Sequence, residues 1–371
     1  MDPLTHTLFG ATLGEAGLKR QTALAMPTLL IGANLPDVDV LAYVNGADAA
    51  LGFRRGWTHG VLAMAILPLV LAGLMFLWGQ RRGLAVRLPN LVLLSYISVW
   101  SHPALDWLNN YGVRLLMPFD GTWFYGDAVF IMDPWLWLLL GGMLYLNRSG
   151  AWQGPGRWIA LAVVTSVPVV AGSLGGVERP GVTHRPWGIL LWVLGLAAIV
   201  LLDRRLASEN GWNRGRYALA ATLLYMLFMV VNTRVVEQRL VERIADLGWN
   251  DVEDVMVSPV PLDALARTIV VARADEYRFA EFHWLDDEPL RFAEASIRRQ
   301  EPTAAVEAAL VAPCIQGMVN WMRFPFFEER EHADGVEVWM IDARYARRPA
   351  AGFGADRVVV GPDLRHRCGR P

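Results

Sequence analysis

Residues 58–79 read THGVLAMAILPLVLAGLMFLWG, a run of 22 residues without a single Lys, Arg, Asp or Glu. A helix of about 20 predominantly apolar residues is long enough to cross the hydrocarbon core of a bilayer. The run therefore predicts a membrane-spanning helix, and the rest of the chain can be compared with it.

Five further apolar runs of comparable length follow this segment, and two weaker ones precede it. The weaker segments, at about 4–18 and 21–36, are short for a full crossing, so a re-entrant helical hairpin is an alternative to two spans. The predicted fold is a polytopic α-helical membrane protein with about 6–8 hydrophobic helices. The five later runs lie at 89–108, 128–146, 157–175, 187–202 and 216–232.

Charged residues are divided unevenly along the chain. They make up 28 of residues 1–232 but 42 of the remaining 139 residues. The second part contains partly alternating, β-rich segments such as Val336–Asp342, separated by Gly, Pro and Asp. We therefore predict a membrane domain at 1–232, a mainly β soluble domain at 233–345 and a flexible tail at 346–371.

Basic residues in short loops indicate the orientation, because they are enriched on the cytoplasmic side of membranes. The loops at 80–88, 147–157 and 203–216 carry nine arginines, and the loops on the opposite side carry five. Lys19 and Arg20 fall on the first side. The sequence thus predicts a multi-pass protein whose C-terminal domain is extracytoplasmic.

Several functional classes are disfavoured by composition and by missing motifs. A net charge of −2 provides no basic footprint for nucleic acid. Two cysteines, Cys314 and Cys368, exclude a multi-bridge disulfide framework or a cysteine-based zinc ribbon, and they leave the redox compartment open. The chain contains no His-Glu-x-x-His, Gly-x-Ser-x-Gly, Walker or dinucleotide-binding motif.

Nine acids and histidines fall at the ends of apolar segments or in loops on the predicted outer side. Ionisable groups at membrane depth are costly, and by default they mark a functional site or a water-filled cavity. Their joint occurrence on one side predicts a polar pocket that opens outward. These residues are His6, Asp37, Asp39, His59, His102, Asp106, Asp120, Asp127 and Asp133.

His102 and Asp106 are spaced i and i+4, which places an imidazole and a carboxylate on one helix face, as needed to hold one metal ion. Nearby imidazoles and carboxylates would complete a ligand set that suits zinc or manganese. A carboxylate that does not bind the metal could act as a general base. The further donors on this side are His6, Asp37, Asp39 and His59.

The same residues also fit roles that need no metal. A His-x₃-Asp pair can be a local hydrogen bond, and an aspartate beside a helix is often a cap, which we expect for Asp120. An ion- or proton-coupled transporter or scaffold could use the same cluster. A third alternative is an adaptor whose soluble domain recruits partners while the membrane part only anchors it.

The order and spacing of several motifs resemble a known family. The motifs are Asp2-Pro3-Leu4-Thr5-His6, Pro36-Asp37-Val38-Asp39, Arg55-Gly56-Trp57-Thr58-His59, His102-Pro103-Ala104-Leu105-Asp106, residues 110–119 and Asp133-Pro134. Together they resemble the YdjM-type family of predicted membrane-bound, metal-dependent hydrolases of the inner membrane, over about residues 1–140 of this chain. That family is in turn distantly similar to zinc-dependent phospholipase C and the single-strand-specific zinc nucleases.

The resemblance implies a set of metal ligands, with zinc as the preferred ion and manganese as the alternative. It selects the first aspartate of the Asp37/Asp39 pair as a ligand, which leaves Asp39 as the catalytic base, and Arg55 could hold a substrate phosphate. The implied ligands are His6, Asp37, His59, His102 and Asp106.

The match to the zinc enzymes is incomplete, because no histidine occurs between His102 and His184 to supply their downstream ligands. The site would therefore hold one or two metals, or Asp120, Asp127 or Asp133 would substitute. The resemblance implies hydrolysis of a phosphoester in a lipid or another membrane-associated substrate. The expected partners are that substrate and the lipid bilayer, with no nucleic acid, and the expected location is the bacterial inner (cytoplasmic) membrane.

Overall fold

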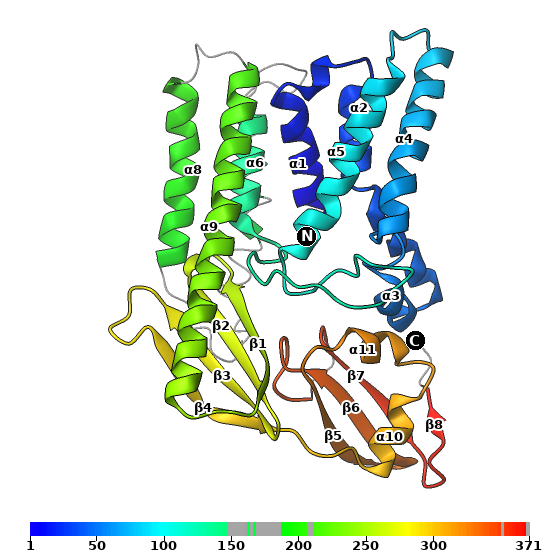
Figure 1. Ribbon diagram of the computed structural model, residues 1–371, viewed down its shortest axis with the longest axis vertical. Helices are drawn as coiled ribbons and strands as arrows, with labels where there is room; N and C mark the ends of the chain where they lie inside the picture. The colour runs from blue at the N-terminus through cyan, green and yellow to red at the C-terminus, as the bar shows by residue number, and fades with distance from the viewer. Residues whose placement is uncertain are drawn as a thin grey trace.

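A computed structural model describes residues 1–146, 160, 162–163, 166–167, 187–205, 211–349 and 352–368. Helices that stand side by side form one half of the molecule, and two β-sheets form the other half (Figure 1). The helix α9 runs from the first half into the second (Figure 1).

In the first half of the molecule, most helices after residue 60 are longer than those before it. Helix α1 begins with a capped turn, in which the Asp2 side chain accepts the N–H of Thr5 and Pro3 occupies the first turn. In chain order the elements are α1 (Pro3–Glu15), η1 (Leu18–Arg20), α2 (Ala25–Gly32), the 3₁₀ segment η2 (Leu35–Asn45), α3 (Ala47–Phe53), α4 (Val61–Arg81), α5 (Leu88–Trp107), α6 (Pro134–Leu146), α8 (Trp187–Arg205) and α9 (Gly211–Asp246).

Fewer helices can cross a membrane than the sequence predicts. In the described part of the chain, α4 and α9 (over Asn213–Asp246) are the two that are long and apolar enough. Helices α1, α2 and α6 have 13, 8 and 13 residues, whereas a crossing needs about 20. The prediction of a polytopic bundle with about 6–8 hydrophobic helices is therefore wrong.

Helix α5 shows why apolar length alone misleads. It has 20 residues, but the structure buries polar side chains on its inner face, namely Ser95, Ser98, His102 and Asp106. The helix is therefore less apolar than α4, and its polar face requires protein around it rather than lipid. The predicted span at 157–175 and the loops at 147–157 and 176–186 lie largely outside the described residues.

Helix α1 packs against α2, α5, α6 and α9. Its Leu8 and Phe9 are buried in one cluster with Leu105 of α5 and Met229 of α9. Helices α4 and α5 pack together through a separate apolar cluster that includes Leu71. This packing brings the N-terminal end of α1 to the C-terminal end of α5, where the Met1 amine contacts Asp106.

The chain after α9 forms two four-stranded antiparallel sheets in which strands adjacent in sequence are paired. The helices α10 (Ala304–Leu310) and α11 (Gln316–Trp321) connect the two sheets. The first sheet contains β1 (Val252–Val260), β2 (Asp263–Arg273), β3 (Glu276–His283) and β4 (Leu290–Arg298), and the second contains β5 (Pro325–His332), β6 (Gly335–Asp342), β7 (Ala355–Val360) and β8 (His366–Arg367).

The C-terminal part of α9 belongs structurally to the first sheet. Val236, Leu240 and Ile244 of this helix are buried in one apolar cluster with Val257 of β1 and Ile269 of β2. The predicted boundary between residues 232 and 233 therefore falls inside a continuous helix, so the two halves are not joined by a loop at this point.

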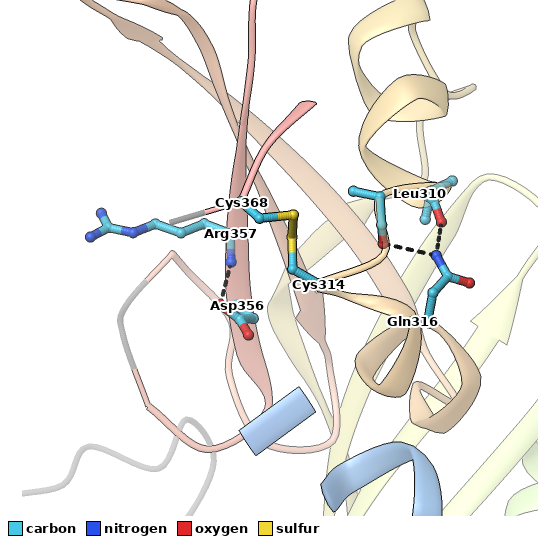
Figure 2. The surroundings of a disulfide bond; sticks show 7 residues. Leu310, Cys314, Gln316, Asp356, Arg357 and Cys368 are labelled. Carbon is cyan, nitrogen blue, oxygen red and sulfur yellow. Dashed lines mark hydrogen bonds between the residues drawn. A yellow bond between two sulfur atoms is a disulfide. The ribbon is translucent and has the colours of Figure 1, made fainter. Parts of the chain in front are cut away.

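The described part of 346–371 differs from the flexible tail that its composition predicts. Strand β7 pairs with β6 from Ala355 to Val360, and β8 pairs with β7. A disulfide joins Cys368, which follows β8, to Cys314, which precedes α11 (Figure 2). This segment completes the second sheet because its β-branched residues pack inward, with Val358 and Val360 buried.

The second sheet is attached to the helical half by a buried charged pair, which we call the Asp342–Arg344 cluster. The Asp342 carboxylate accepts hydrogen bonds from Nε and Nη2 of Arg344, at 2.9 and 2.7 Å. Arg344 also donates to the carbonyls of Asn110, at 2.7 Å, and Trp321, at 2.9 Å. Asn110 follows α5, so this cluster ties the sheet to the chain segment that leaves that helix.

A second attachment joins α11 to α3. The N–H of Met318 donates to the Asp48 carboxylate at 2.9 Å, and Gly317 lies directly against Gly52. An added Cβ at Gly317 would clash with the Asp48 carbonyl, so only glycine allows the two helices to approach this closely. Since α3 leads into Arg54 and Arg55, this contact also positions the chain near the candidate site.

Candidate metal centre

The candidate site lies where α5 ends beside the start of α1 (Figure 1). Helix α5 supplies His102 and Asp106, η2 supplies Asp37, and the loop before α4 supplies His59. One donor atom from each of these four residues lies within 4.8 Å of the other three. His59, His102 and Asp106 are fully buried, and 13% of the Asp37 side chain is exposed.

His102 is held in one tautomer by the backbone of Ala33, the residue that follows α2. Its Nδ1 lies 2.6 Å from the carbonyl oxygen of Ala33, which can only accept, so Nδ1 carries the proton. The unprotonated Nε2 lies 3.6 Å from Oδ1 of Asp37 and 3.5 Å from Oδ2 of Asp106. A lone pair therefore faces two carboxylate oxygens.

His59 has the same arrangement, with a side chain in place of the carbonyl. Its Nδ1 lies 3.0 Å from the Thr58 hydroxyl and 3.4 Å from Oδ2 of Asp39. The Thr58 hydroxyl in turn donates to the same Asp39 oxygen at 3.2 Å. With its proton on Nδ1, His59 presents a bare Nε2 at 3.3 Å from Oδ2 of Asp106.

These facing acceptors fit a divalent cation. Nε2 of His59 and Nε2 of His102 both face Oδ2 of Asp106, and all three atoms are buried without a hydrogen-bond partner. Asp37 directs Oδ1 at Nε2 of His102, and its Oδ2 is likewise buried and unpaired. Metal–ligand distances of about 2.0–2.2 Å in a tetrahedron place donor atoms about 3.4 Å apart, close to the separations found here. Two imidazole nitrogens and two carboxylates are donors that zinc and manganese both accept.

The two oxygens of Asp106 have different surroundings. Oδ1 contacts two donor groups, the Met1 amine and Nη2 of Arg55 at 2.9 Å, and it also lies 3.3 Å from Nε2 of His6. Oδ2 faces only the bare nitrogens of the other two histidines. One oxygen is therefore fixed by the protein, which leaves the other directed at the metal position.

His6 lies beside the four-residue group. Its ring stacks on the ring of His102, with centroids 3.7 Å apart, and neither ring nitrogen has a hydrogen-bond partner. It is not among the four residues whose donor atoms converge. The structure thus brings the predicted ligand His6 to the site, with Asp106 as its nearest carboxylate, and the ligand role of His6 stays a prediction.

Arg55 is buried and directed inward. Besides Asp106, it contacts the side chain of Asn109 at 2.9 Å and the ring of Tyr111, whose centroid is 4.4 Å from its guanidinium carbon. Burial lowers the pKa of Arg55 to about 10, so it is still a cation at neutral pH. With its donors already bonded, Arg55 is placed to hold Asp106 rather than to meet a substrate.

Arg54 was not among the sequence candidates, yet it lies at the part-exposed side of the site. Its Nη2 is 3.3 Å from Oδ1 of Asp37 and its Nε is 3.6 Å from Oδ1 of Asp39. About a quarter of its side chain is exposed, compared with 3% for Arg55. The Arg54-Arg55 pair itself was the only available signal, and it does not indicate which arginine turns inward.

Asp39 supports the site from behind His59. It is buried, and Oδ2 also accepts the backbone N–H of Arg55 at 2.9 Å. Burial raises the pKa of Asp39, opposed by this hydrogen bond. Its position matches that of a carboxylate that orients a metal-binding histidine.

The three later aspartates do not join the group. Asp120 is exposed and accepts hydrogen bonds from Thr122 in a segment without helix, so it is a local turn residue and not the helix cap that we expected. Asp127 pairs with Arg323 at 2.7 Å, and Asp133 accepts two backbone N–H groups at the start of α6. They are therefore not substitutes for the downstream ligands of the zinc enzymes.

The fold and the site together define a membrane-associated helical protein with a buried His/Asp centre and a β-sheet extension. Residues 1–178 match the model of the YdjM inner membrane protein family. The match covers the part of the chain that contains every residue of the candidate site, so the predicted resemblance to that family is confirmed. No curated protein and no solved structure matches the chain.

Proposed function

We propose that this protein is a membrane-bound hydrolase that uses a divalent cation, preferably zinc, to cleave a phosphoester in a lipid or another membrane-associated substrate. The observation that carries the proposal is that Asp37, His59, His102 and Asp106 converge on one point and each has a buried donor atom without a hydrogen-bond partner. Buried polar atoms are almost always paired, and unpaired ones concentrate where a protein binds or reacts.

The residues around the centre divide the work. Asp37, His59, His102 and Asp106 would hold the cation, which would supply Lewis-acid polarisation of the phosphoryl oxygen. Asp39 fixes the tautomer of His59 and Arg55 fixes Asp106, so both act as positioning residues. Arg54 at the part-exposed side binds the substrate phosphate, and Oδ2 of Asp37 accepts the proton of the attacking water.

We further propose that the site and the β-sheets lie on the extracytoplasmic side of the inner membrane. The Cys314–Cys368 disulfide supports this, since such bonds persist in oxidising compartments. Arg81, Arg82 and Arg87 lie at the other end of α4 from the site, where the positive-inside rule expects the cytoplasm. A reporter enzyme that is active only outside the cytoplasm, fused after residue 368, should be active.

Metal analysis of the protein purified in detergent tests the main proposal. We expect stoichiometric zinc in the wild type and in His332→Ala, an exposed histidine at the end of β5, and its loss in His102→Ala. A chelator should lower the melting temperature of the first two proteins but not of His102→Ala.

The competing class gives a different result. If the wild type holds no metal and a chelator leaves its melting temperature unchanged, the cluster handles protons or ions, and a transporter explains it better. If metal is present, release of nitrophenol from bis(p-nitrophenyl) phosphate should depend on it and should be absent in His102→Ala.

A further inference from the structure

We propose that η2 and the loop before α4 form a lipid-binding surface, so that a phospholipid enters the centre sideways from the membrane interface. This inference rests on the proposed function and adds the route and the class of substrate. We call the surface the apolar rim and define it by Val38, Val40, Leu41, Tyr43, Val44 and Trp57.

The rim is exposed although it is apolar. Val44 is 87% exposed, Leu41 66%, Tyr43 52% and Trp57 51%. Side chains at i and i+3 eclipse one another in a 3₁₀ helix, so Val38, Leu41 and Val44 form one line along η2. Contiguous apolar surface of this kind usually marks a contact with a membrane, a ligand or another protein.

The same short segment also builds the centre. Asp37 directly precedes Val38, and Asp39 lies between Val38 and Leu41. Asp37 contacts His102, and Asp39 contacts His59. The metal-site residue Asp37 and the exposed Val38 are therefore neighbours in the chain. A molecule lying on the rim would be adjacent to the site.

Continuity with α4 identifies the occupant. Trp57 lies four residues before this candidate span, whose first residues Val61 and Leu62 are themselves 44% and 46% exposed. The N–H of Val61 is bonded to the Leu115 carbonyl, which brings the loop with the 79%-exposed Phe119 to the same level. Exposed Trp, Tyr and Phe at the end of a membrane helix are typical of the lipid headgroup region.

The chemistry at the rim fits a lipid phosphate. Acyl chains can remain beside the apolar side chains while a headgroup phosphate reaches the part-exposed guanidinium of Arg54. Arg54 directly precedes the buried Arg55 and contacts Asp37. A phospholipid therefore matches both the apolar rim and the cation beside the metal centre.

Fluorescence quenching tests the membrane contact without relying on metal or turnover. A nitrobenzoxadiazole label is attached to Val44→Cys, to Leu74→Cys in the middle of α4, and to Ser296→Cys on the exposed face of β4. The proteins are placed in phospholipid nanodiscs containing lipids with nitroxide-labelled acyl chains. We expect quenching at positions 44 and 74 and none at 296.

The outcomes separate the two proposals. A water-like, unquenched label at position 44 overturns the rim, including the case where it instead crosslinks to a second copy of the chain. Zinc measured in the same three proteins tests the function separately. Leu41→Asp should also retain zinc and act on the soluble phosphodiester within about 2-fold of wild type, while cleavage of lipid in mixed micelles falls at least about 10-fold. Equal losses on both substrates would assign Leu41 a purely structural role and overturn the route.

Discussion

The metal centre and the Asp342–Arg344 cluster both bury charged side chains, but their atoms are paired to different extents. Both Asp342 oxygens accept hydrogen bonds, and the guanidinium of Arg344 also reaches two backbone carbonyls. In the centre, four donor atoms on four residues have no partner. Because unpaired buried polar atoms cost free energy, their concentration in one place distinguishes a binding site from a structural joint.

Asp342→Asn should cause the largest change in stability, because it leaves the Arg344 cation buried without its counter-charge. Loss of one partner of a buried pair costs about 3–5 kcal/mol, which should lower the melting temperature by at least about 6 °C. Calorimetry or a thermal-shift assay in detergent measures this. Asp363→Asn, which removes one partner of the exposed pair with Arg365, is the matched control and should change the melting temperature by about 1 °C or less.

The same substitution at Asp37 should behave in the opposite way. Asp37→Asn should weaken zinc binding by more than about 100-fold, since a ligand is lost. In the chelated protein it should change the melting temperature by less than about 2 °C, because Oδ2 has no hydrogen bond to lose and the ion pair of Oδ1 is with the part-exposed Arg54, where such pairs contribute little. A destabilisation as large as that of Asp342→Asn would mean that the two clusters do not differ in kind.

Asp39→Asn should have an intermediate effect, since it alters the orientation of His59 without removing a ligand. A carboxylate behind a metal-binding histidine is worth about 10- to 100-fold in metal affinity. Competition with a zinc-binding dye gives the affinity. An unchanged affinity would leave Asp39 as a catalytic base rather than a positioning residue, and the pH profile of hydrolysis would then lose its acidic limb in this variant.

Arg54→Gln should have the smallest effect on the metal. Removing a part-exposed cation beside Asp37 should change zinc affinity by less than about 5-fold, in the direction of tighter binding. Hydrolysis should suffer mainly through a higher KM. If Arg54→Gln instead leaves KM unchanged while Arg55→Gln with retained zinc raises it, the phosphate-binding role returns to Arg55.

The sequence predicted the composition of the centre better than its details. The i, i+4 spacing of His102 and Asp106 is a rule of helix geometry, and the structure holds both at one point. The different burial of Arg54 and Arg55 could not be predicted, because Arg55 adopts a left-handed backbone conformation, with φ of 51°, that separates the two side chains. No pattern in the sequence indicates such a turn at an arginine.

The fold was predicted less well, for two physical reasons. Hydropathy measures how apolar a segment is but not whether protein or lipid surrounds it. The segment of α6 was therefore counted as a span, and that of α2 as either a span or half of a re-entrant hairpin. The pairing of Cys314 with Cys368 and the addition of β7 and β8 to the second sheet depend on tertiary contacts, the disulfide across a sequence separation of 54. Composition alone therefore made the C-terminal segment look loose.

Helix α9 sets the geometry between the bilayer and the sheets. Its 36 residues span about 54 Å, roughly 24 Å more than the hydrocarbon core of a membrane. The part of α9 beyond this length carries the residues that pack on β1 and β2. The helix therefore fixes both the distance of the first sheet from the membrane and its rotation about the helix axis. One residue added between Met229 and Val236 would lift that sheet by about 1.5 Å and rotate it by about 100°. The number of residues in this helix therefore sets both the distance of the first sheet from the bilayer and its rotation about the helix axis.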